Sequence, residues 1–213
     1  CEDSMNIIVF GASGGTGREL LKQALDKGIE VTAFVRDATK LKDIQNPNLA
    51  VVSGDVLNKE DVNRSVAGHE AVLYAVGAGP KRTTIREQGS RNVIEAMQAS
   101  GVKRLVCLSS FGVGDSKADL SFFTRYVVVG IFLRHAFADH ERQEAVVKAS
   151  VLDWTLVRPP HLKPGAHTGT YQHGLTLAYG NIEGWISRGD LADFMLKQLE
   201  DDRYIGQAPR VSY

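Results

Sequence analysis

A glycine-rich turn near the amino terminus constrains the fold more than any other feature of the sequence. The apolar run Ile7–Phe10 leads into glycines at positions 11, 14 and 17, and an amphipathic helical pattern follows. Glycines in a strand–turn–helix unit permit a tight turn, a close approach of the backbone to a pyrophosphate, and close helix–strand packing. A tight turn without a ligand would also use glycine, but the flanking strand and helix favour a dinucleotide site. We expect its contacts to come from Gly11, Ser13, Gly14, Gly15, Thr16 and Gly17.

Short apolar runs alternate with helical patterns along most of the chain, as in a parallel sheet covered by helices. Several runs are apolar throughout, which is typical of strands buried on both faces. We therefore predict an α/β fold with a Rossmann-type, doubly wound parallel sheet, in a single domain over residues 5–213. The expected strands are Asn6–Phe10, Glu30–Val35, Ala50–Ser53, Ala71–Val76, Arg104–Ser109 and Asp153–Arg158, and the expected helices are Gly15–Lys27, Lys59–Val66, Thr84–Ser100, His135–Ser150 and Ser187–Leu199.

The last third of the sequence is less regular. The breaks Pro159-Pro160 and Pro164-Gly165 interrupt the pattern, and we expect an irregular segment to about Gly184. We interpret it as a substrate-side elaboration of the same domain. Residues 1–4 are expected to be an expression remnant or a frayed terminus outside the fold.

The charge balance limits which kinds of partner the protein can bind, and the cysteines indicate the redox state of its compartment. Lysine plus arginine and aspartate plus glutamate each number 25, which argues against a nucleic-acid binder with its basic face. The sequence has 2 cysteines, and Cys107 lies in an apolar run, so we expect a buried thiol and a reducing, cytoplasmic compartment. No apolar run is long enough to cross a membrane, and no histidine spacing indicates a metal site. We expect a monomer or weak dimer whose partner is a small planar molecule.

The end of the second expected strand bears on the choice of dinucleotide. Arg36-Asp37 stands there, nineteen residues past the last glycine, and Lys40 follows. An acidic residue at this place binds ribose hydroxyls in NAD sites, whereas arginine accommodates the 2′-phosphate of NADP. A planar guanidinium and a nearby ammonium favour NADP(H), although these charges could also be solvated at a helix start. The sequence favours NADP over NAD.

The ends of the third and fourth strands supply further candidates. Asp55 could accept a hydrogen bond from an adenine amino group while Val56 packs on the ring, or Asp55 could equally cap the helix that begins near Lys59. Gly77 ends the fourth strand, where a small residue leaves room for ribose and nicotinamide.

Several short motifs, taken in their order along the chain, resemble those of a known family. The glycine turn, Val35-Arg36-Asp37, Gly54-Asp55-Val56, Gly89-Ser90-Arg91-Asn92-Val93 and Arg158-Pro159-Pro160-His161 together resemble atypical short-chain dehydrogenase/reductases of the NAD(P)H-binding kind. The closest resemblance is to the biliverdin-IXβ reductases, also called flavin reductases, and it spans Asn6 to Tyr213. It implies hydride transfer from NADPH to a flavin or a linear tetrapyrrole.

The resemblance also implies roles for individual residues. It places the 2′-phosphate at Arg36 and Lys40 and adenine at Asp55 and Val56. Ser109 corresponds to the serine beside the nicotinamide, and His161 and His140 to two pocket histidines.

The residues themselves leave these roles open. Ser109 could hold the nicotinamide amide or organise a water, or merely cap the strand end. His161 could line the cleft or close a turn, and His140 could titrate in the pocket or lie on a solvated helix face. Arg91 could pair with a carboxylate or reach the cofactor cleft.

The usual catalytic acid of short-chain dehydrogenases, the tyrosine of a Tyr-x-x-x-Lys pair, is missing. Gly130 stands four residues after Tyr126, and Leu175 four residues after Tyr171. Ketone–alcohol interconversion is therefore disfavoured against reduction of an acceptor that needs little help with protons, such as a flavin. The same absence fits a non-catalytic NADP(H)-sensing regulatory protein, and a sugar-nucleotide epimerase is a weaker third alternative.

The segment 118–135 departs from the family pattern. Its aromatic and β-branched residues favour a core or dimer-facing helix over a ligand wall, yet the segment lies where a lid is expected. It puts the identity of the acceptor in doubt.

Overall fold

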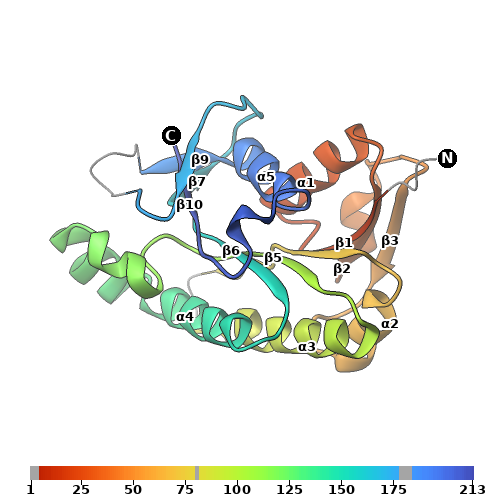
Figure 1. Cartoon of the computed structure of the whole chain (residues 1–213), viewed down its shortest axis with the longest axis horizontal. Helices are drawn as coiled ribbons and strands as arrows, with labels where there is room; N and C mark the ends of the chain where they lie inside the picture. The colour runs from red at the N-terminus through yellow and green to blue at the C-terminus, as the bar shows by residue number, and fades with distance from the viewer. Residues whose placement is uncertain (1–4, 80–81, 178–183) are drawn as a thin grey trace.

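The structure is a computed structural model that describes residues 5–79, 82–177 and 184–213. Six parallel strands form its sheet, in the order β3-β2-β1-β4-β5-β6 (Figure 1). The strands are β1 (Asn6–Phe10), β2 (Glu30–Val35), β3 (Leu49–Ser53), β4 (Ala71–Tyr74), β5 (Arg104–Leu108) and β6 (Asp153–Val157). The predicted doubly wound parallel sheet is confirmed, with strand bounds that differ from the expected ones by two residues or fewer.

Helices cover both faces of the sheet. The helices α1 (Gly15–Asp26) and α5 (Arg188–Lys197) lie on one face, and α2 (Lys59–Val66), α3 (Ile85–Ser100) and α4 (Arg134–Lys148) lie on the other (Figure 1). Each face has its own apolar cluster, because the strand side chains alternate between the two faces. Ile7 and Val9 of β1 pack toward α1 and α5, whereas Ile8 and Phe10 pack toward α2 and α3.

Local sequence signals explain several helix ends. The Asn58 side chain accepts hydrogen bonds from the backbone N–H groups of Glu60 and Asp61 and so caps α2. Gly101 ends α3 with a φ of 79°, a left-handed conformation that glycine adopts without strain. Ser187 caps α5 by accepting from the backbone N–H of Asp190.

The carboxy-terminal third is more ordered than expected. The strand β7 (His161–Lys163) pairs in parallel with β9 (Trp185–Ser187), and β8 (Gln172–Gly174) pairs antiparallel with β10 (Arg210–Ser212). The expectation of an irregular segment to Gly184 is therefore wrong in part. Strands of three residues are too short to show a periodic pattern, and their pairing depends on residues distant in sequence.

The segment between β5 and α4 forms two short helices, η2 (Gly114–Asp119) and the π-helix η3 (Thr124–Phe132). Three phenylalanines in and beside η3 are exposed: Phe122 by 78%, Phe123 by 65% and Phe132 by 70%. The interpretation of this segment as a core helix is wrong. Within η3 only Val129 is buried, and it packs in a small apolar cluster with Phe111 and Leu120.

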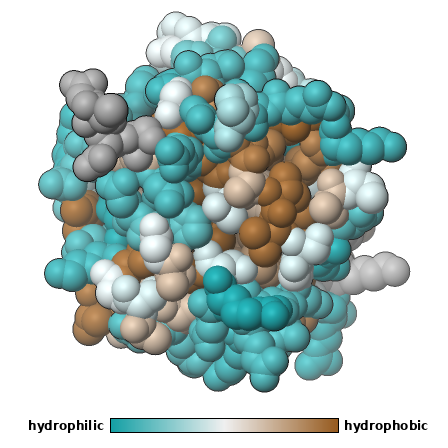
Figure 2. Space-filling model, turned by 90° about the vertical axis from the view of Figure 1, so that its right-hand side faces the viewer, coloured by the Kyte–Doolittle hydropathy of each residue, from teal (hydrophilic) through white to brown (hydrophobic). Residues whose placement is uncertain are grey.

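The edge strand β3 leaves a second apolar surface in contact with solvent. Figure 2 shows hydrophobic side chains gathered in the middle of the face that carries this edge. Val51 of β3 is 40% exposed and Leu57, just beyond the strand, is 44% exposed. An edge strand has one neighbour only, so side chains near it lack the cover that central strands receive.

Candidate functional site

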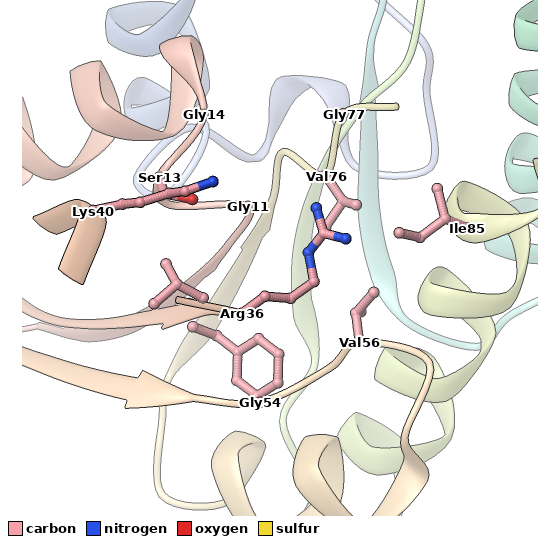
Figure 3. A pocket seen from close by; sticks show the side chains of 12 residues that line it. Gly11, Ser13, Gly14, Arg36, Lys40, Gly54, Val56, Val76, Gly77 and Ile85 are labelled. Atoms are coloured by element: carbon pink, nitrogen blue, oxygen red, sulfur yellow. The ribbon is translucent and has the colours of Figure 1, made fainter. Parts of the chain in front are cut away.

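A pocket of about 260 Å³ lies at the carboxyl ends of the central strands. The strand order reverses between β1 and β4, and ligands of open α/β sheets bind in the crevice at such a switch point. Every element that lines the pocket ends or begins there (Figure 3). The lining residues are Gly11, Ser13, Gly14, Phe34, Val35, Arg36, Lys40, Gly54, Val56, Val76, Gly77 and Ile85.

The glycine turn has the geometry of a diphosphate cradle. Gly11 has a φ of 78°, and a Cβ there would lie 2.5 Å from the carbonyl oxygen of Ala75. A Cβ on Gly17 would lie 2.2 Å from the carbonyl oxygen of Gly11, so the helix packs on the turn only without a side chain. The turn therefore requires glycine at both positions.

The amino terminus of α1 is free to bind an anion. Its N-cap residue is Gly14, which has no side chain to cap the backbone N–H groups, and no acidic residue lies in the first turn. Unpaired backbone N–H groups and the helix dipole then favour a negative charge at this end. The turn and the helix start together fit the diphosphate of a dinucleotide.

Within the predicted loop, the residues divide between two sides of α1. Gly11, Ser13 and Gly14 line the pocket. Thr16 and Gly17 are buried in the helix start, and Gly15 faces Arg188 of α5. The side of Gly15 that would carry a Cβ is thus turned away from the pocket.

Two cations enter the pocket from β2 and the short helix η1 (Ala38–Leu41) that follows. The guanidinium of Arg36 extends over the pocket, and Lys40 extends toward the glycine turn (Figure 3). Asp37 is engaged elsewhere, because its Oδ1 accepts from the backbone N–H of Thr39 at 3.0 Å and from its hydroxyl at 2.6 Å. These hydrogen bonds hold the pKa of Asp37 below its usual range. The carboxylate therefore caps η1, and the pocket receives positive charge from this strand end.

On the opposite side the pocket wall is apolar. Val56 and Ile85 line it, and Gly77 lies between them and the turn (Figure 3). Asp55 is not among the lining residues, and its Oδ1 accepts from the backbone N–H of Leu57 at 3.0 Å. The interpretation of Asp55 as the cap of α2 is wrong, because Asn58 has that role.

A buried ion pair holds the loop that follows β4. Arg86, only 6% exposed, donates through Nη2 to the carbonyl oxygen of Ala78 at 2.8 Å and through Nη1 to Asp139 at 3.3 Å. The Asp139 carboxylate also accepts from the backbone N–H groups of Arg86 and Glu87 at the start of α3. This arrangement fixes the position of Gly77, which precedes Ala78, relative to α3 and α4.

Ser109 lies at the carboxyl end of β5 and is part of a second buried network. Its hydroxyl donates to Oε1 of Glu144 at 2.7 Å, and Arg158 donates to both oxygens of Glu144, at 2.8 and 2.6 Å. Arg158 also donates to Asp115 of η2 at 2.6 Å. Burial raises the pKa of Glu144, but the hydrogen bonds and charge of Arg158 outweigh it and hold the pKa below its usual range. Glu144 is therefore a carboxylate, and Ser109 is the donor.

His140 lies one helical turn before Glu144 on α4. Its Nδ1 is 3.1 Å from Oε1 of Gln143, and the amide nitrogen of Gln143 donates to Ser90 and Cys107, each at 3.3 Å. Burial, followed by the charge of Arg86, lowers the pKa of His140 to about 4. The ring is neutral near pH 7. The ring is half-buried, so His140 does not lie on a fully solvated face of the helix, which was the alternative to a pocket position.

Two predicted site residues lie outside these groups. His161 begins β7 and is exposed, with its backbone N–H bonded to Gly184 at 3.2 Å. Arg91 is exposed on α3 and lies 3.7 Å from the carboxylate of Glu87, so the alternative of pairing with a carboxylate is confirmed. Neither residue lines the pocket.

A tyrosine–lysine contact does occur, but it has the wrong chemistry for an acid. Lys197 of α5 lies 3.3 Å from the Tyr171 hydroxyl, which donates to Asp193 at 2.6 Å. Burial and the bond to the Asp193 carboxylate raise the pKa of Tyr171. The described part of the chain thus offers no tyrosine of lowered pKa at the pocket.

Glu144, Arg86 and Asp139 are functional candidates that the sequence analysis missed. All three lie in helices with ordinary charged faces, and their burial depends on how α3 and α4 pack. The sequence does contain one signal for this network. Arg158 ends an apolar strand, and a charge at the end of a buried strand needs a buried partner of opposite charge.

Two further kinds of feature are absent from the described residues. No helix there is both long and apolar enough to span a membrane. No group of three or more histidine, cysteine, aspartate or glutamate side chains there is arranged to hold a metal ion.

Comparison with known proteins identifies relatives and structural neighbours. Residues 11–202 match the family model described as NAD(P)H-binding. An uncharacterized protein of Bacillus subtilis, YwnB, is 31% identical over 206 residues, covering 92% of each chain. A short-chain dehydrogenase/reductase of Veillonella parvula, solved with NADP, superposes with a TM-score of 0.82 at 15% identity, covering 98% of this chain and 94% of that one. ChuY of Escherichia coli O157:H7, described as an anaerobillin reductase, superposes with a TM-score of 0.79 at 24% identity, covering 98% and 97%.

Proposed function

The chain belongs to the NAD(P)H-binding family, and on that basis we propose that it is an NADPH-dependent reductase of a planar conjugated acceptor, a flavin or a linear tetrapyrrole. The observation that carries the proposal is the pocket itself. Arg36 and Lys40 extend into it beside a glycine turn, while Asp37 is held by Thr39. A guanidinium and an ammonium fit the 2′-phosphate of NADP, and the free start of α1 fits the diphosphate.

The expected chemistry is hydride transfer. Bound NADPH supplies the hydride, which carries two electrons, and the acceptor gains one proton from water to complete its reduction. The protein contributes binding and orientation: the turn and cations hold the dinucleotide, Val56 and Ile85 provide an apolar wall, and Ser109 lies at the next strand end. The description of ChuY as an anaerobillin reductase supports a tetrapyrrole as one acceptor.

The direct test is turnover by the purified full chain. NADPH is mixed with FMN, riboflavin or biliverdin, and its oxidation is followed by nicotinamide absorbance. We expect NADPH oxidation that depends on the protein and on the acceptor, with NADH much less effective. No turnover with flavins, tetrapyrroles and quinones would overturn the proposal of a reductase.

One observation favours a second function, NADP(H) sensing without catalysis. The Ser109 hydroxyl donates its hydrogen bond to the Glu144 carboxylate, and no tyrosine is among the residues that line the pocket, so the site lacks an evident proton donor. A sensor would bind NADP⁺ and NADPH with different affinities and would not pass the hydride of NADPH to any acceptor. Isothermal titration with both forms, run beside the turnover assay, separates the two functions.

A further inference from the structure

The segment before α4 leaves a cluster of large apolar side chains uncovered. Five of the nine exposed large hydrophobic residues in the described part of the chain lie between positions 122 and 132. Figure 1 shows this segment, in green, beyond α4 at one end of the long axis of the molecule. An exposed apolar patch of this kind marks a surface of contact. We call it the aromatic ridge, and it consists of Phe122, Phe123, Tyr126, Ile131 and Phe132.

The charge beside the aromatic ridge is of one sign. Residues 120–138 contain no aspartate or glutamate, but they contain Arg125 and Arg134. The carboxylates that border this stretch are held by arginines of the core. Asp119 lies 2.6 Å from the buried arginine of β10, and Asp139 is buried against the arginine of α3. The ridge is therefore apolar and is bordered by positive charge.

A groove of about 350 Å³ lies beside the ridge, between η3 and α4. Its lining includes three cations and several apolar side chains, among them Lys117, Arg125, Arg134, Val129 and Phe137. Glu141 also lines the groove, but its carboxylate lies 3.5 Å from the ammonium of Lys117. The two arginines thus give the groove an excess of positive charge next to apolar surface.

Both arginines contact aromatic rings of their own segment. The guanidinium carbon of Arg125 lies 5.5 Å from the centroid of the Tyr126 ring, and Nε of Arg134 donates to Nε2 of His135 at 3.3 Å. These contacts leave both guanidinium charges uncompensated by any carboxylate that the structure describes. A guanidinium can bind a phosphate through two parallel N–H groups. A ligand that satisfies the arginines and also covers the ridge must be amphiphilic and negatively charged.

We propose that the aromatic ridge and its groove bind the surface of a bilayer that contains anionic lipids. Arg125 and Arg134 meet the negative charge of the headgroups, and the phenylalanines of the ridge enter the boundary between headgroups and acyl chains. Aromatic and aliphatic side chains next to arginine or lysine are typical of protein segments that lie in a membrane interface. The contact is with one leaflet only. The inference adds a location to the proposed reductase activity and is tested independently of it.

A second copy of the chain complements this surface less well than a bilayer does. In a dimer with twofold symmetry the same patch faces itself. Arg125 and Arg134 of one copy would then approach those of the other, and residues 120–138 supply no carboxylate to pair with them. A negatively charged bilayer neutralises these cations and covers the phenylalanines at the same time.

Binding is measured by sedimentation of the full chain with sucrose-loaded vesicles. Vesicles of phosphatidylcholine alone are compared with vesicles of phosphatidylcholine and phosphatidylglycerol in equal amounts, at low and at high salt. We expect binding to the anionic vesicles to weaken at high salt, because ions screen exposed charges. Binding to phosphatidylcholine alone should be about tenfold to thirtyfold weaker. No binding to the anionic vesicles, or equal binding to both kinds, would overturn the proposal.

The double variant Arg125→Gln/Arg134→Gln tests the electrostatic contribution. A cation near an anionic surface raises the affinity about fivefold, so we expect about twenty-fivefold weaker binding to the anionic vesicles. The matched control Arg64→Gln/Arg203→Gln removes two charges from exposed ion pairs elsewhere on the surface and should lose much less. Equal losses would mean that net charge alone attracts the vesicles, and the assignment of this groove would be wrong.

The double variant Phe122→Ser/Phe132→Ser tests the apolar contribution. Both rings are exposed, so thermal unfolding should be unchanged, while binding to the anionic vesicles should fall about tenfold for each ring. The control Val151→Ser, at a residue that is 86% exposed beyond the other end of α4, should bind like the wild type. Unchanged binding in the phenylalanine variant would contradict the proposal.

The oligomeric state of the same proteins tests the competing occupant. Sedimentation equilibrium without vesicles is run on the wild type and on Phe122→Ser/Phe132→Ser. We expect the two proteins to have the same mass in solution. A wild-type dimer that dissociates in the variant would mean that a second copy covers the aromatic ridge, and the bilayer proposal would be wrong.

Discussion

The hydroxyl of Ser109 donates a 2.7 Å hydrogen bond to Oε1 of Glu144. This contact joins the end of β5, beside the nucleotide pocket, to a buried carboxylate that Arg158 holds with two further bonds. The residue that the sequence suggested as a catalytic group is thus tied into the protein core. The hydroxyl proton of Ser109 is used in this bond, so Ser109 is not free to donate that proton to a substrate.

Glu144→Gln is expected to destabilise the fold strongly. Arg158 is 0% exposed, and removal of the charge opposite a buried cation costs about 3–5 kcal/mol. Urea unfolding should show a lower midpoint with little change in slope. Glu141→Gln is the matched control, since Glu141 lies on the same helix in an exposed pair with Lys117 at 3.5 Å, and such pairs contribute about 0–1 kcal/mol. Equal losses in the two variants would contradict the role of the buried pair.

Arg36→Gln is expected to reduce the preference for NADPH over NADH. A charge-assisted bond to phosphate is worth about 1.5–3 kcal/mol, so the Kd for NADPH should rise roughly tenfold to hundredfold while that for NADH changes little. Fluorescence titration of each dinucleotide measures both constants. Arg203→Gln removes the same charge from an exposed pair with Asp201 and should leave both affinities unchanged. An equal loss for NADH would show that Arg36 does not read the 2′-phosphate.

Alanine substitutions at Gly17 and Gly15 should differ in their effects on stability and on NADPH binding. In Gly17→Ala the new Cβ meets backbone, 2.2 Å from the carbonyl oxygen of Gly11, and we expect a loss of about 2–3 kcal/mol of stability and of NADPH binding. In Gly15→Ala the Cβ meets the flexible side chain of Arg188, so folding and binding should remain. Thermal unfolding and NADPH titration of both variants check this. Loss of binding in Gly15→Ala would mean that the cofactor also uses that side of the helix.

The sheet could be predicted from the sequence because its signals are local. Each central strand is an apolar run bounded by turn residues, and the glycine turn needs only its own neighbours to be recognised. The expected and observed bounds of β1, β2 and α2 are identical. Asn58 shows the limit of such reasoning, because Asp55 and Asn58 both precede the helix and only the backbone path decides which of them caps it.

The rest of the site depends on tertiary packing. Nothing local distinguishes Glu144, which is buried against Arg158, from Glu141, which is exposed on the same helix. The short pairs β7–β9 and β8–β10 join segments that are distant along the chain. In the aromatic segment around η3, the composition indicated burial, but too little core exists beside it to cover those side chains.

Stability should fall with acid in a way that depends on His140. Its pKa is about 4 in the folded protein, because of burial and the charge of Arg86, against an ordinary value of 6.5. Between these pH values the unfolded chain binds a proton that the folded chain does not, so lowering the pH through this window favours unfolding. The stabilising contribution is complete above about pH 6.5 and is lost as the pH falls toward 4. Its size is on the order of 1–3 kcal/mol after allowance for the partial exposure of the ring.

The measurement is the free energy of unfolding by urea at several pH values for the wild type and for His140→Gln, which has no titratable ring. The neighbouring charges Arg86, Asp139 and Glu144 are common to both proteins, so their contributions cancel in the difference. We expect the wild type to lose more stability than the variant between pH 6.5 and pH 4, and the two to change in parallel above pH 7. Parallel curves over the whole range would mean that His140 takes up its proton as readily in the folded protein as in the unfolded chain, contrary to its burial against α3.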